Sequence, residues 1–478
     1  MKVCRPVSRR MEENLEMIRR ETGGCFDVSL RRIKTAHGQD VGIFYIDGLV
    51  SKETIQDNVV RPIVEPHFRK ERLLCETIEN LHKMVLSACD VTVEREMGMC
   101  LTSLLSGDTL LFLQGADAAL VIQTRGWKSR GIPEPKTQNS VRGPMEAFCE
   151  TLLFNTALLR RKIKSPNLRF EMLKIGAQTR TDVCIAYLEG TAKPELLGMV
   201  RRRLKKINVD YILESGHIEQ LIEDHKYSLF PTVGNNEKPD IVAAKLLKGR
   251  VAVFVDGTPF VLTVPLLFVE NFHTAEDYYT RPYYANMLRI LRILSYIITL
   301  CLPAAYIALV NFHPEMIPQK LLYTIMKAKD GIPFPSELEV FLMLMLYEIL
   351  REAVLRLPTP VGSTVGIVGG LIIGEAAVSA GIVGGPVVVV AAVTFMTSAA
   401  VNPTMDSTAL LRLILLVLAG FMGIFGILLG IFGIFAHLCS LKSFGVPYMM
   451  PISPVSKQGA KDAVIRTGIR GILRRRRS

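Results

Sequence analysis

Five charged side chains stand among long apolar runs in the last third of the chain, where charged groups are rare. They are Glu348, Arg351, Glu352, Arg356 and Glu375. A charge at the centre of a bilayer costs about 2.5–3.5 kcal/mol on insertion scales, so such residues usually face a protein interior or water. The pattern therefore favours pore or gate residues that shape an ion or substrate path. The alternatives are helix-surface ion pairs for the first four and a neutral, packed carboxyl for Glu375.

The segments around these residues are long enough to cross a membrane. A hydrocarbon core of about 30 Å needs roughly 20 apolar residues in a helix. We expect four full spans within a transmembrane domain over 289–441, at 293–312, 357–375, 376–405 and 413–441. The segment 336–356 carries too many charges to insert easily, so we expect an amphipathic or re-entrant helix there. Six spans are an alternative.

Glycines recur in two of these spans at intervals of three and four residues, which places them on one helix face. Such faces let helices approach closely. The helix-packing candidates are Gly366, Gly370, Gly374, Gly423, Gly426 and Gly430. No Lys-Ser or Lys-Thr pair follows the first set, so a phosphate-binding loop is not indicated.

The soluble region before the spans reads as a duplication. Four apolar strands each end in an acidic or amide residue followed by glycine, and Gly48 to Gly115 and Gly190 to Gly257 are both 67 residues apart. Each half reads as strand, helix, helix and hairpin. Coincidence is the alternative, because such turns are common. The fold class is therefore an α/β cytosolic region of two similar subdomains, followed by an α-helical polytopic membrane domain.

The expected boundaries follow from this pattern. Residues 1–28 form an N-terminal tail, 29–124 and 166–288 form the two α/β subdomains, 125–165 form a linker loop and helix, and 442–478 form a basic tail. The candidates for contacts between the subdomains are Arg142, Asp47 and Asp256.

The net charge of +12 is concentrated where a membrane protein would carry it. Arg289 and Arg292 precede the first span and a basic tail follows the last, so the positive-inside rule predicts that both termini are cytosolic. No apolar core of a signal peptide is visible in the first twenty residues, which carry six Lys or Arg. The run Arg474–Arg477 suits a solvated tail near anionic headgroups better than nucleic-acid binding.

The sequence contains no recognisable motif of an enzyme active site. The nine cysteines lack a C-x-x-C pair, so we expect neither disulfides nor a zinc site. No metalloprotease, P-loop or nucleophile-elbow motif is present. We therefore expect no catalytic, cofactor-binding or metal residues.

Several short motifs, in order from residue 26 to 462, resemble the A subunits of GerA-type spore germinant receptors. The motifs are Tyr45-Ile46-Asp47-Gly48, Val141-Arg142-Gly143-Pro144, Val255-Asp256-Gly257-Thr258-Pro259-Phe260, Glu276-Asp277-Tyr278-Tyr279, Leu350-Arg351-Glu352-Ala353 and Ser443-Phe444-Gly445-Val446-Pro447-Tyr448.

This resemblance implies a function and partners. It implies a multi-pass subunit of the spore inner membrane that forms a homo-oligomeric ring, with a pentamer expected, and passes cations when nutrients are sensed. The implied partners are a permease-like B subunit, a lipoprotein C subunit and the lipid bilayer, without nucleic acid or a cofactor. Alternatives are an accessory channel subunit of the SpoVAF type, a non-conducting scaffold for the germinant sensor, and a secondary transporter.

Overall fold

The computed structural model describes residues 5–35, 38–64, 90–126, 135, 138, 142–401, 405–455, 462, 463, 465 and 466. The chain forms two compact units. The first contains Met1–Lys226, Val233–Leu266 and Ser443–Gly445, and the second contains Tyr227–Thr232, Leu267–Lys442 and Val446–Ser478.

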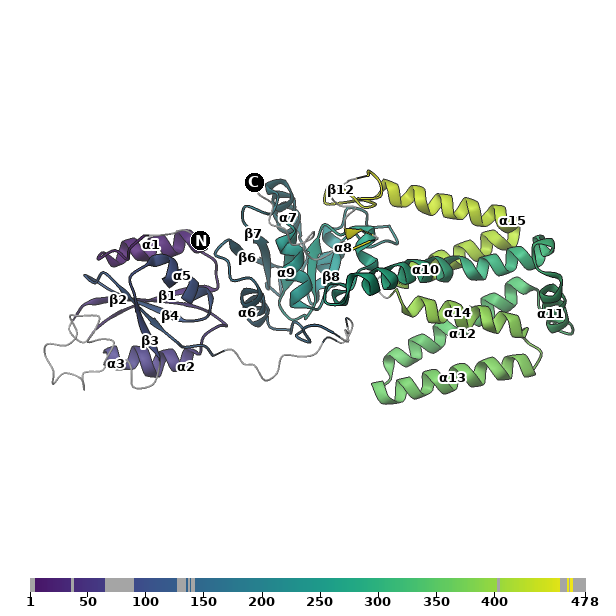
Figure 1. The fold of residues 1–478 in the computed structure, drawn as a ribbon, viewed down its shortest axis with the longest axis horizontal. Coiled ribbons are helices and arrows are strands. Elements are labelled where there is room, and N and C mark those ends of the chain that lie inside the picture. The colour runs from purple at the N-terminus through teal and green to yellow at the C-terminus, as the bar shows by residue number, and fades with distance from the viewer. Residues whose placement is uncertain are drawn as a thin grey trace. The chain divides into compact units, whose positions relative to one another are not determined.

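The first unit contains two five-stranded antiparallel sheets with the same strand order (Figure 1). The first sheet has the order β1 (Val28–Lys34), β2 (Asp40–Ile46), β4 (Thr109–Leu113), β5 (Ala119–Ile122) and β3 (Val91–Glu94). The second has the order β6 (Leu168–Ile175), β7 (Thr181–Leu188), β9 (Val251–Val255), β10 (Val261–Val264) and β8 (Gly234–Asn236). The matching orders confirm the predicted pair of similar α/β subdomains.

The four repeated turns have a conformation that explains their glycines. Gly48, Gly115, Gly190 and Gly257 have φ angles of 85°, 92°, 77° and 90°. Residues with a Cβ adopt this left-handed region only at a cost, whereas glycine adopts it freely. The repeated glycine is therefore the sequence trace of one backbone turn used four times.

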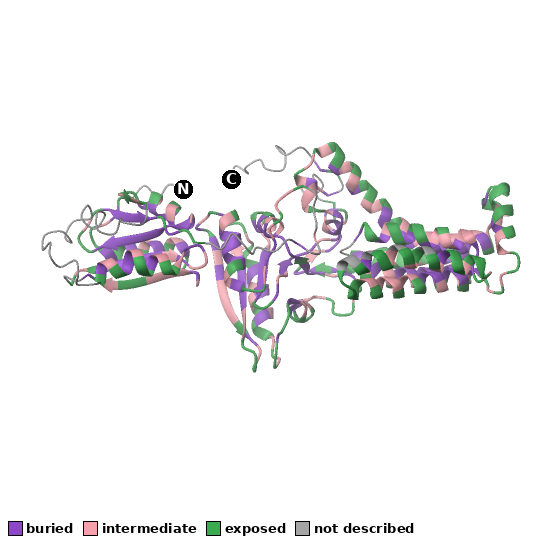
Figure 2. Cartoon of the chain, turned by 90° about the horizontal axis from the view of Figure 1, so that it is seen from below, coloured by how far each residue is buried: buried purple, intermediate pink, exposed green. Residues whose placement is uncertain are grey.

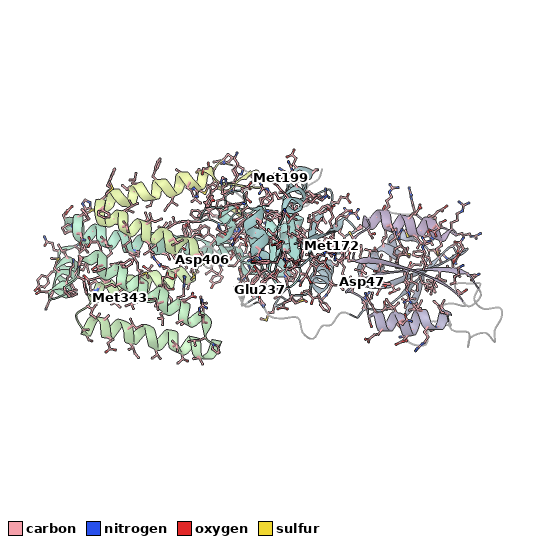
Figure 3. All side chains as sticks on the ribbon, turned by 180° about the vertical axis from the view of Figure 1, so that it is seen from behind. Asp47, Met172, Met199, Glu237, Met343 and Asp406 are labelled. Carbon is pink, nitrogen blue, oxygen red and sulfur yellow. The ribbon has the colours of Figure 1, made fainter. Side chains whose placement is uncertain are left out.

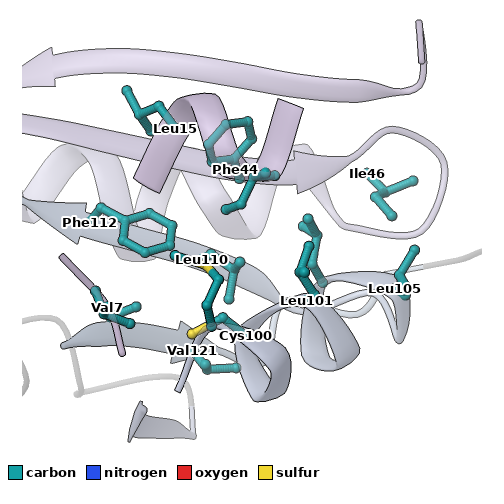
Figure 4. Close-up of a cluster of buried hydrophobic side chains, with 14 of the residues drawn as sticks. Val7, Leu15, Phe44, Ile46, Cys100, Leu101, Leu105, Leu110, Phe112 and Val121 are labelled. Carbon is teal, nitrogen blue, oxygen red and sulfur yellow. The ribbon is translucent and has the colours of Figure 1, made fainter. Parts of the chain in front are cut away.

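Helices cover both faces of the first sheet. On one face lie α1 (Met11–Thr22) and α5 (Met97–Leu105), and on the other lie α2 (Lys52–Ile55), the π-helical segment Gln56–Val60 and α3 (Arg61–Val64). In Figure 4, Leu15 and Leu101 lie in the same apolar cluster as Phe44 and Phe112. The central strand β4 is buried along its whole length, as expected for a strand covered on both sides.

Residues 1–28, expected as a tail, contain one of these covering helices. In α1 the buried residues Met11, Leu15 and Ile18 follow the spacing of one helix face and join the core of the first sheet. The many exposed charges on the other face make the segment appear polar when only its composition is considered.

The second sheet is covered in the same way. On one face lie α7 (Pro194–Lys206) and α8 (Ser215–Ile222), and on the other lie α6 (Leu152–Lys162) and α9 (Pro239–Leu247). The core on the first of these faces also contains Phe444, from the segment that follows the last long helix in sequence. The Arg203 guanidinium lies 4.3 Å from the centre of the Phe444 ring.

The helix α6 joins the two subdomains. The Asp256 carboxylate accepts a hydrogen bond from the Leu152 N–H at 2.9 Å at the start of this helix. At its other end Arg160, fully buried, donates to the equally buried carboxylate of Asp27, just before β1, at 2.8 Å. A Cβ on Gly48 would lie only 2.9 Å from the side chain of Ala157 in α6, so this turn packs directly against the helix.

The second unit is helical. Its elements are the 3-10 helices Phe268–Phe272, Ala275–Tyr278 and Pro314–Met316, the π-helical segment Ala308–Phe312, and the α-helices α10 (Pro282–Ile307), α11 (Gln319–Lys329), α12 (Ser336–Arg356), α13 (Thr359–Ser379), α14 (Gly385–Ala399) and α15 (Met405–Ser440). Among the described residues, the helices Pro282–Phe312 and Met405–Ser440 are long and apolar enough to cross a membrane. Many side chains on the outer helix faces of this unit are exposed (Figure 2).

The segment 413–441, expected as one straight span, reverses direction within α15. Gly423 has φ 59° and ψ −138°, which is not helical. A Cβ on Gly426 would clash with the Leu418 carbonyl oxygen, and one on Gly430 would clash with Leu415 Cδ2. In a straight helix these pairs would be about 12 and 22 Å apart along the axis. The two limbs of α15 therefore form a closely packed hairpin (Figure 1).

Both ends of this hairpin reach the same short segment. Ser407, near the start of α15, donates to the Leu229 carbonyl, and His437, near its end, lies 3.1 Å from the Ser228 hydroxyl. Because neighbouring residues bind the two ends, the second limb returns to where the first began.

The buried pair between Asp27 and Arg160 predicts a large stability effect. Asp27→Asn leaves the Arg160 charge buried without its counter-ion, which should lower the free energy of unfolding by about 3–5 kcal/mol. Urea unfolding of the detergent-solubilised chain, followed by circular dichroism, measures this cost. The exposed pair between Glu12 and Arg32 provides the control Glu12→Gln, expected to cost less than about 1 kcal/mol. Equal costs for the two variants would contradict the proposed importance of burial.

The hairpin predicts opposite outcomes for two glycines in the same limb. Gly430→Leu should separate the limbs and cost about 1–3 kcal/mol from overpacking. Gly433→Leu should be neutral or slightly stabilising, because a Cβ there meets no atom within 4 Å and leucine favours helix over glycine. Thermal unfolding in detergent micelles compares them, and a straight span is indicated if the two variants behave alike.

Candidate functional site

Two helices of the second unit bring three charged side chains together. Glu348 and Arg351 lie one turn apart on α12, and Arg412 comes from the first limb of α15. One oxygen of the Glu348 carboxylate lies 2.7 Å from an Arg412 guanidinium nitrogen, and the other lies 2.8 Å from a nitrogen of Arg351. The structure thus joins two of the predicted pore or gate residues to a third that was not predicted.

This cluster is buried and carries a surplus positive charge. The Arg412 side chain is only 2% exposed, and those of Glu348 and Arg351 are 23% exposed. Two guanidinium groups share one carboxylate, and the Nε atoms of both arginines are buried without a hydrogen-bond partner among the described residues. Removing the carboxylate would leave two like charges facing each other in a medium of low dielectric constant.

Apolar and aromatic contacts surround the cluster. The ring of Tyr347 packs edge-on against Phe395 of α14 at a centroid distance of 4.3 Å. Met343, labelled in Figure 3, lies in a buried cluster with Val387 of α14 and Leu416 of α15. The ion pairs and this packing together hold α12, α14 and α15 as one group.

The second predicted pair on α12 lies on the surface. Glu352 accepts a hydrogen bond from the Arg356 Nε at 2.9 Å, and both side chains are more than half exposed. This geometry suits the helix-surface pair that was the alternative interpretation, with an energy of about 0.2–0.5 kcal/mol.

Glu375 lies on an exposed face of α13 and has no ion pair among the described residues. The glycines of α13, in contrast, lie close to other helices of the same chain. A Cβ on Gly366 would lie 3.5 Å from Val354 of α12, and one on Gly374 would lie 3.4 Å from Val388 of α14. One on Gly370 would lie 4.0 Å from Leu350. The glycines thus face the helices of the same chain, while the carboxylate faces away from them.

The three candidates in the first unit have different surroundings. Asp256 holds the start of α6, as described above. Asp47, labelled in Figure 3, lies 2.8 Å from the Lys52 Nζ and accepts from Ser29, both within the first subdomain. Arg142 is exposed. The tie between subdomains at Asp27 and Arg160 was not predicted.

The basic residues expected just before the first span lie within α10 and are neutralised rather than free. Arg289 and Arg292 both donate to the buried carboxylate of Asp277 at 2.9–3.0 Å, and Arg289 also donates to Asp462 at 3.1 Å. Burial by itself raises the pKa of Asp277, but the hydrogen bonds and charges of Arg292 and Arg289 hold that pKa below its ordinary value. The carboxylate therefore stays ionised at neutral pH.

Sequence reasoning missed two residues of the membrane unit. Arg412 directly precedes the predicted span 413–441, and its signal was a lone cation beside an apolar run. Glu339 is buried at the start of α12, although the sequence shows it only as one of several acids in an amphipathic segment. Among the residues that the structure describes, no group of three or more His, Cys, Asp or Glu is arranged to hold a metal ion.

Comparison with known proteins decides the family. The family model described as Bacillus/Clostridium GerA spore germination protein matches residues 16–478. The chain belongs to the GerA family. As an A subunit of a spore germination receptor of this family, it is a membrane protein and not an enzyme.

Relatives match this GerA family protein over nearly their whole length. Spore germination protein KA of Bacillus subtilis (strain 168) is 44% identical over 96% of this chain and 85% of its own. The uncharacterized membrane protein YfkQ of the same organism is 40% identical over 97% and 90%. Spore germination protein GerLA of Bacillus cereus is 36% identical over 95% and 92%.

A solved structure covers part of the chain. The crystal structure of the N-terminal domain of the A subunit of the Bacillus megaterium spore germinant receptor GerK3 is 35% identical. It covers 56% of this chain and 99% of its own, with a TM-score of 0.45.

The charge cluster predicts that Glu348 and Glu352 differ in their importance. Glu348→Gln should lower the free energy of unfolding by about 3–5 kcal/mol, because it leaves the buried Arg412 guanidinium and the partly exposed Arg351 guanidinium without their counter-ion. Glu352→Gln, four residues along the same helix, removes an exposed pair and should cost less than about 1 kcal/mol. Thermal unfolding of the purified protein in detergent compares them. If Glu348→Gln is as stable as the wild type, the cluster does not hold the helices together.

Proposed function

We propose that this chain is the pore-forming A subunit of a nutrient-gated cation channel in the spore inner membrane. The observation that carries the proposal is the outward position of Glu375 on α13. The helix is anchored to its own chain through glycines, and its only acid points away from that chain.

An acid in this position needs a polar environment. In contact with lipid, an ionised carboxylate would cost several kcal/mol or would take up a proton. Placing the same face around an aqueous path between copies of the chain removes that cost. A ring of carboxylates in a pore attracts cations and repels anions. This argument supports a homo-oligomer, and the family resemblance favours a pentamer.

The buried charge cluster supports a different role for α12. The charges of Glu348, Arg351 and Arg412 are paired largely with one another inside one chain. These ion pairs therefore suit a structural frame, formed by α12 and α15, that fixes one helix against the other. The exposed residues Glu352, Arg356 and Glu375 remain the candidates for the pore or gate. The frame would then transmit a movement of α15 to α12 and α13 as one group.

The resemblance also supplies the partners and the location in this proposal. A permease-like B subunit would hold the nutrient, and a lipoprotein C subunit would complete the receptor. Both termini would be cytosolic. For the channel to open, the nutrient must bind the open state more tightly than the closed state.

Charge reversal at Glu375 tests the pore. In planar bilayers containing the assembled receptor, Glu375→Lys should lower the permeability of K⁺ relative to Cl⁻ by roughly tenfold or more, because it places cations around the path. The shift in reversal potential measures this ratio. Glu315→Lys, at an exposed position before α11, is the control and should leave the ratio nearly unchanged.

Two outcomes would redirect the proposal. If the wild type shows no nutrient-dependent conductance but the chain is required for assembly with its partners, it is a non-conducting scaffold. If conductance appears without nutrient dependence and only adds to that of another receptor, it is an accessory subunit of the SpoVAF type. An unchanged reversal potential in Glu375→Lys excludes α13 as the pore lining.

A further inference from the structure

A second acid in the membrane unit, Glu339, is buried without a basic partner. Its side chain lies in the first turn of α12 and is 1% exposed. The Oε2 atom accepts a hydrogen bond from the Gly384 N–H at 2.8 Å. The Oε1 atom is buried and has no hydrogen-bond partner, and Glu339 has no ion pair among the described residues.

The contrast with Glu348 shows what is unusual about this site. Glu348 is more exposed and lies between two arginines, whereas Glu339 is fully buried and receives one neutral donor. Gly384 is the residue before α14, so the carboxylate lies at the positive end of that helix dipole. The dipole stabilises a negative charge there, but it does not satisfy the lone pairs of Oε1. A buried oxygen in this state needs a donor or a positive charge.

The surroundings of the carboxylate suit a cation. A Cβ on Gly384 would lie 3.4 Å from the Ala328 carbonyl oxygen and 3.5 Å from Glu339 Oε2, so this carbonyl lies beside the turn that binds the carboxylate. Ala328 is in the last turn of α11, where the helix dipole is negative and carbonyls lack intrahelical donors. Carboxylate and carbonyl oxygens are the groups that hold alkali cations in proteins.

We infer that Glu339 binds a small cation at its free oxygen, at the junction of α11, α12 and the turn before α14. The occupant is a monovalent metal ion, shared with carbonyl oxygens. The neighbouring titratable groups are Tyr306 of α10, which interacts electrostatically with Glu339, and Lys329 of α11, which donates to Ser336. The inference goes beyond ion conduction, because the site would exist in a channel or in a scaffold.

Thermal unfolding of the full-length protein in detergent tests the inference. Choline chloride is replaced stepwise by KCl or NaCl at constant ionic strength and constant pH. A bound metal ion should raise the melting temperature saturably, because a ligand that binds only the folded state stabilises it. A melting temperature that does not change with K⁺ or Na⁺ would contradict the site.

Variants at two positions of one helix assign the effect. Glu339→Gln should abolish the dependence on K⁺ or Na⁺, while leaving Tyr306 and Lys329 in place. Glu337→Gln, two residues away, removes an acid that accepts from Asn311 and should retain the dependence. If Glu339→Gln does not fold, Glu339→Asp should shift the half-maximal K⁺ concentration at least tenfold.

The inference fails in two cases. One is a wild-type melting temperature that does not depend on K⁺ or Na⁺. The other is a dependence that persists unchanged in the Glu339 variants. Both results can be obtained without measuring conductance, so they are independent of a failure of the channel proposal.

Discussion

The helices of the membrane unit are held together by ion pairs between arginines and carboxylates that are largely shielded from water. Glu348 accepts from two arginines of different helices, and this contact fixes which helices are neighbours. Without the carboxylate, Arg351 and Arg412 would repel each other in a medium that screens charges poorly. The same requirement explains the pairing of Arg289 and Arg292 with Asp277 at the start of α10. These four arginines are thus structural ties as well as charges.

The soluble unit consists of two similar subdomains that are joined by one helix, α6. Both sheets use the same strand order and the same left-handed glycine turns, so each subdomain buries a central strand between two helical layers. The shared helix α6 is held at its start by a carboxylate of the second subdomain and at its end by one that precedes the first sheet. Because Arg160 and Asp27 are both fully buried, moving one subdomain against the other would expose an unpaired charge.

Features that depend on local backbone conformation can be predicted from the sequence, whereas pairings between distant residues cannot. The duplication could be predicted because glycine is the residue that tolerates the turn at Gly48 and its three equivalents. The pairing of Glu348 with Arg412 could not, because the two are far apart in sequence and only tertiary structure selects the partner. The glycines of the last span were ambiguous for another reason. Spacings of three and four suit a straight helix that packs on a neighbour, and they equally suit Gly426 and Gly430 packing against an earlier limb of the same helix.

The fold-back at Gly423 affects whether the chain crosses the membrane an odd or an even number of times. A helix that returns to its starting side contributes an even number of crossings, and so does the pair formed by α13 and α14. If both termini are cytosolic, as in the proposed topology, the total must be even, yet α10 by itself contributes a single passage. That topology then needs one more traverse, which α12, with 21 residues, is long enough to make in place of the re-entrant helix expected from its charges. In such a traverse Glu348 would be accompanied by Arg412 of the folded-back limb, 2.7 Å away.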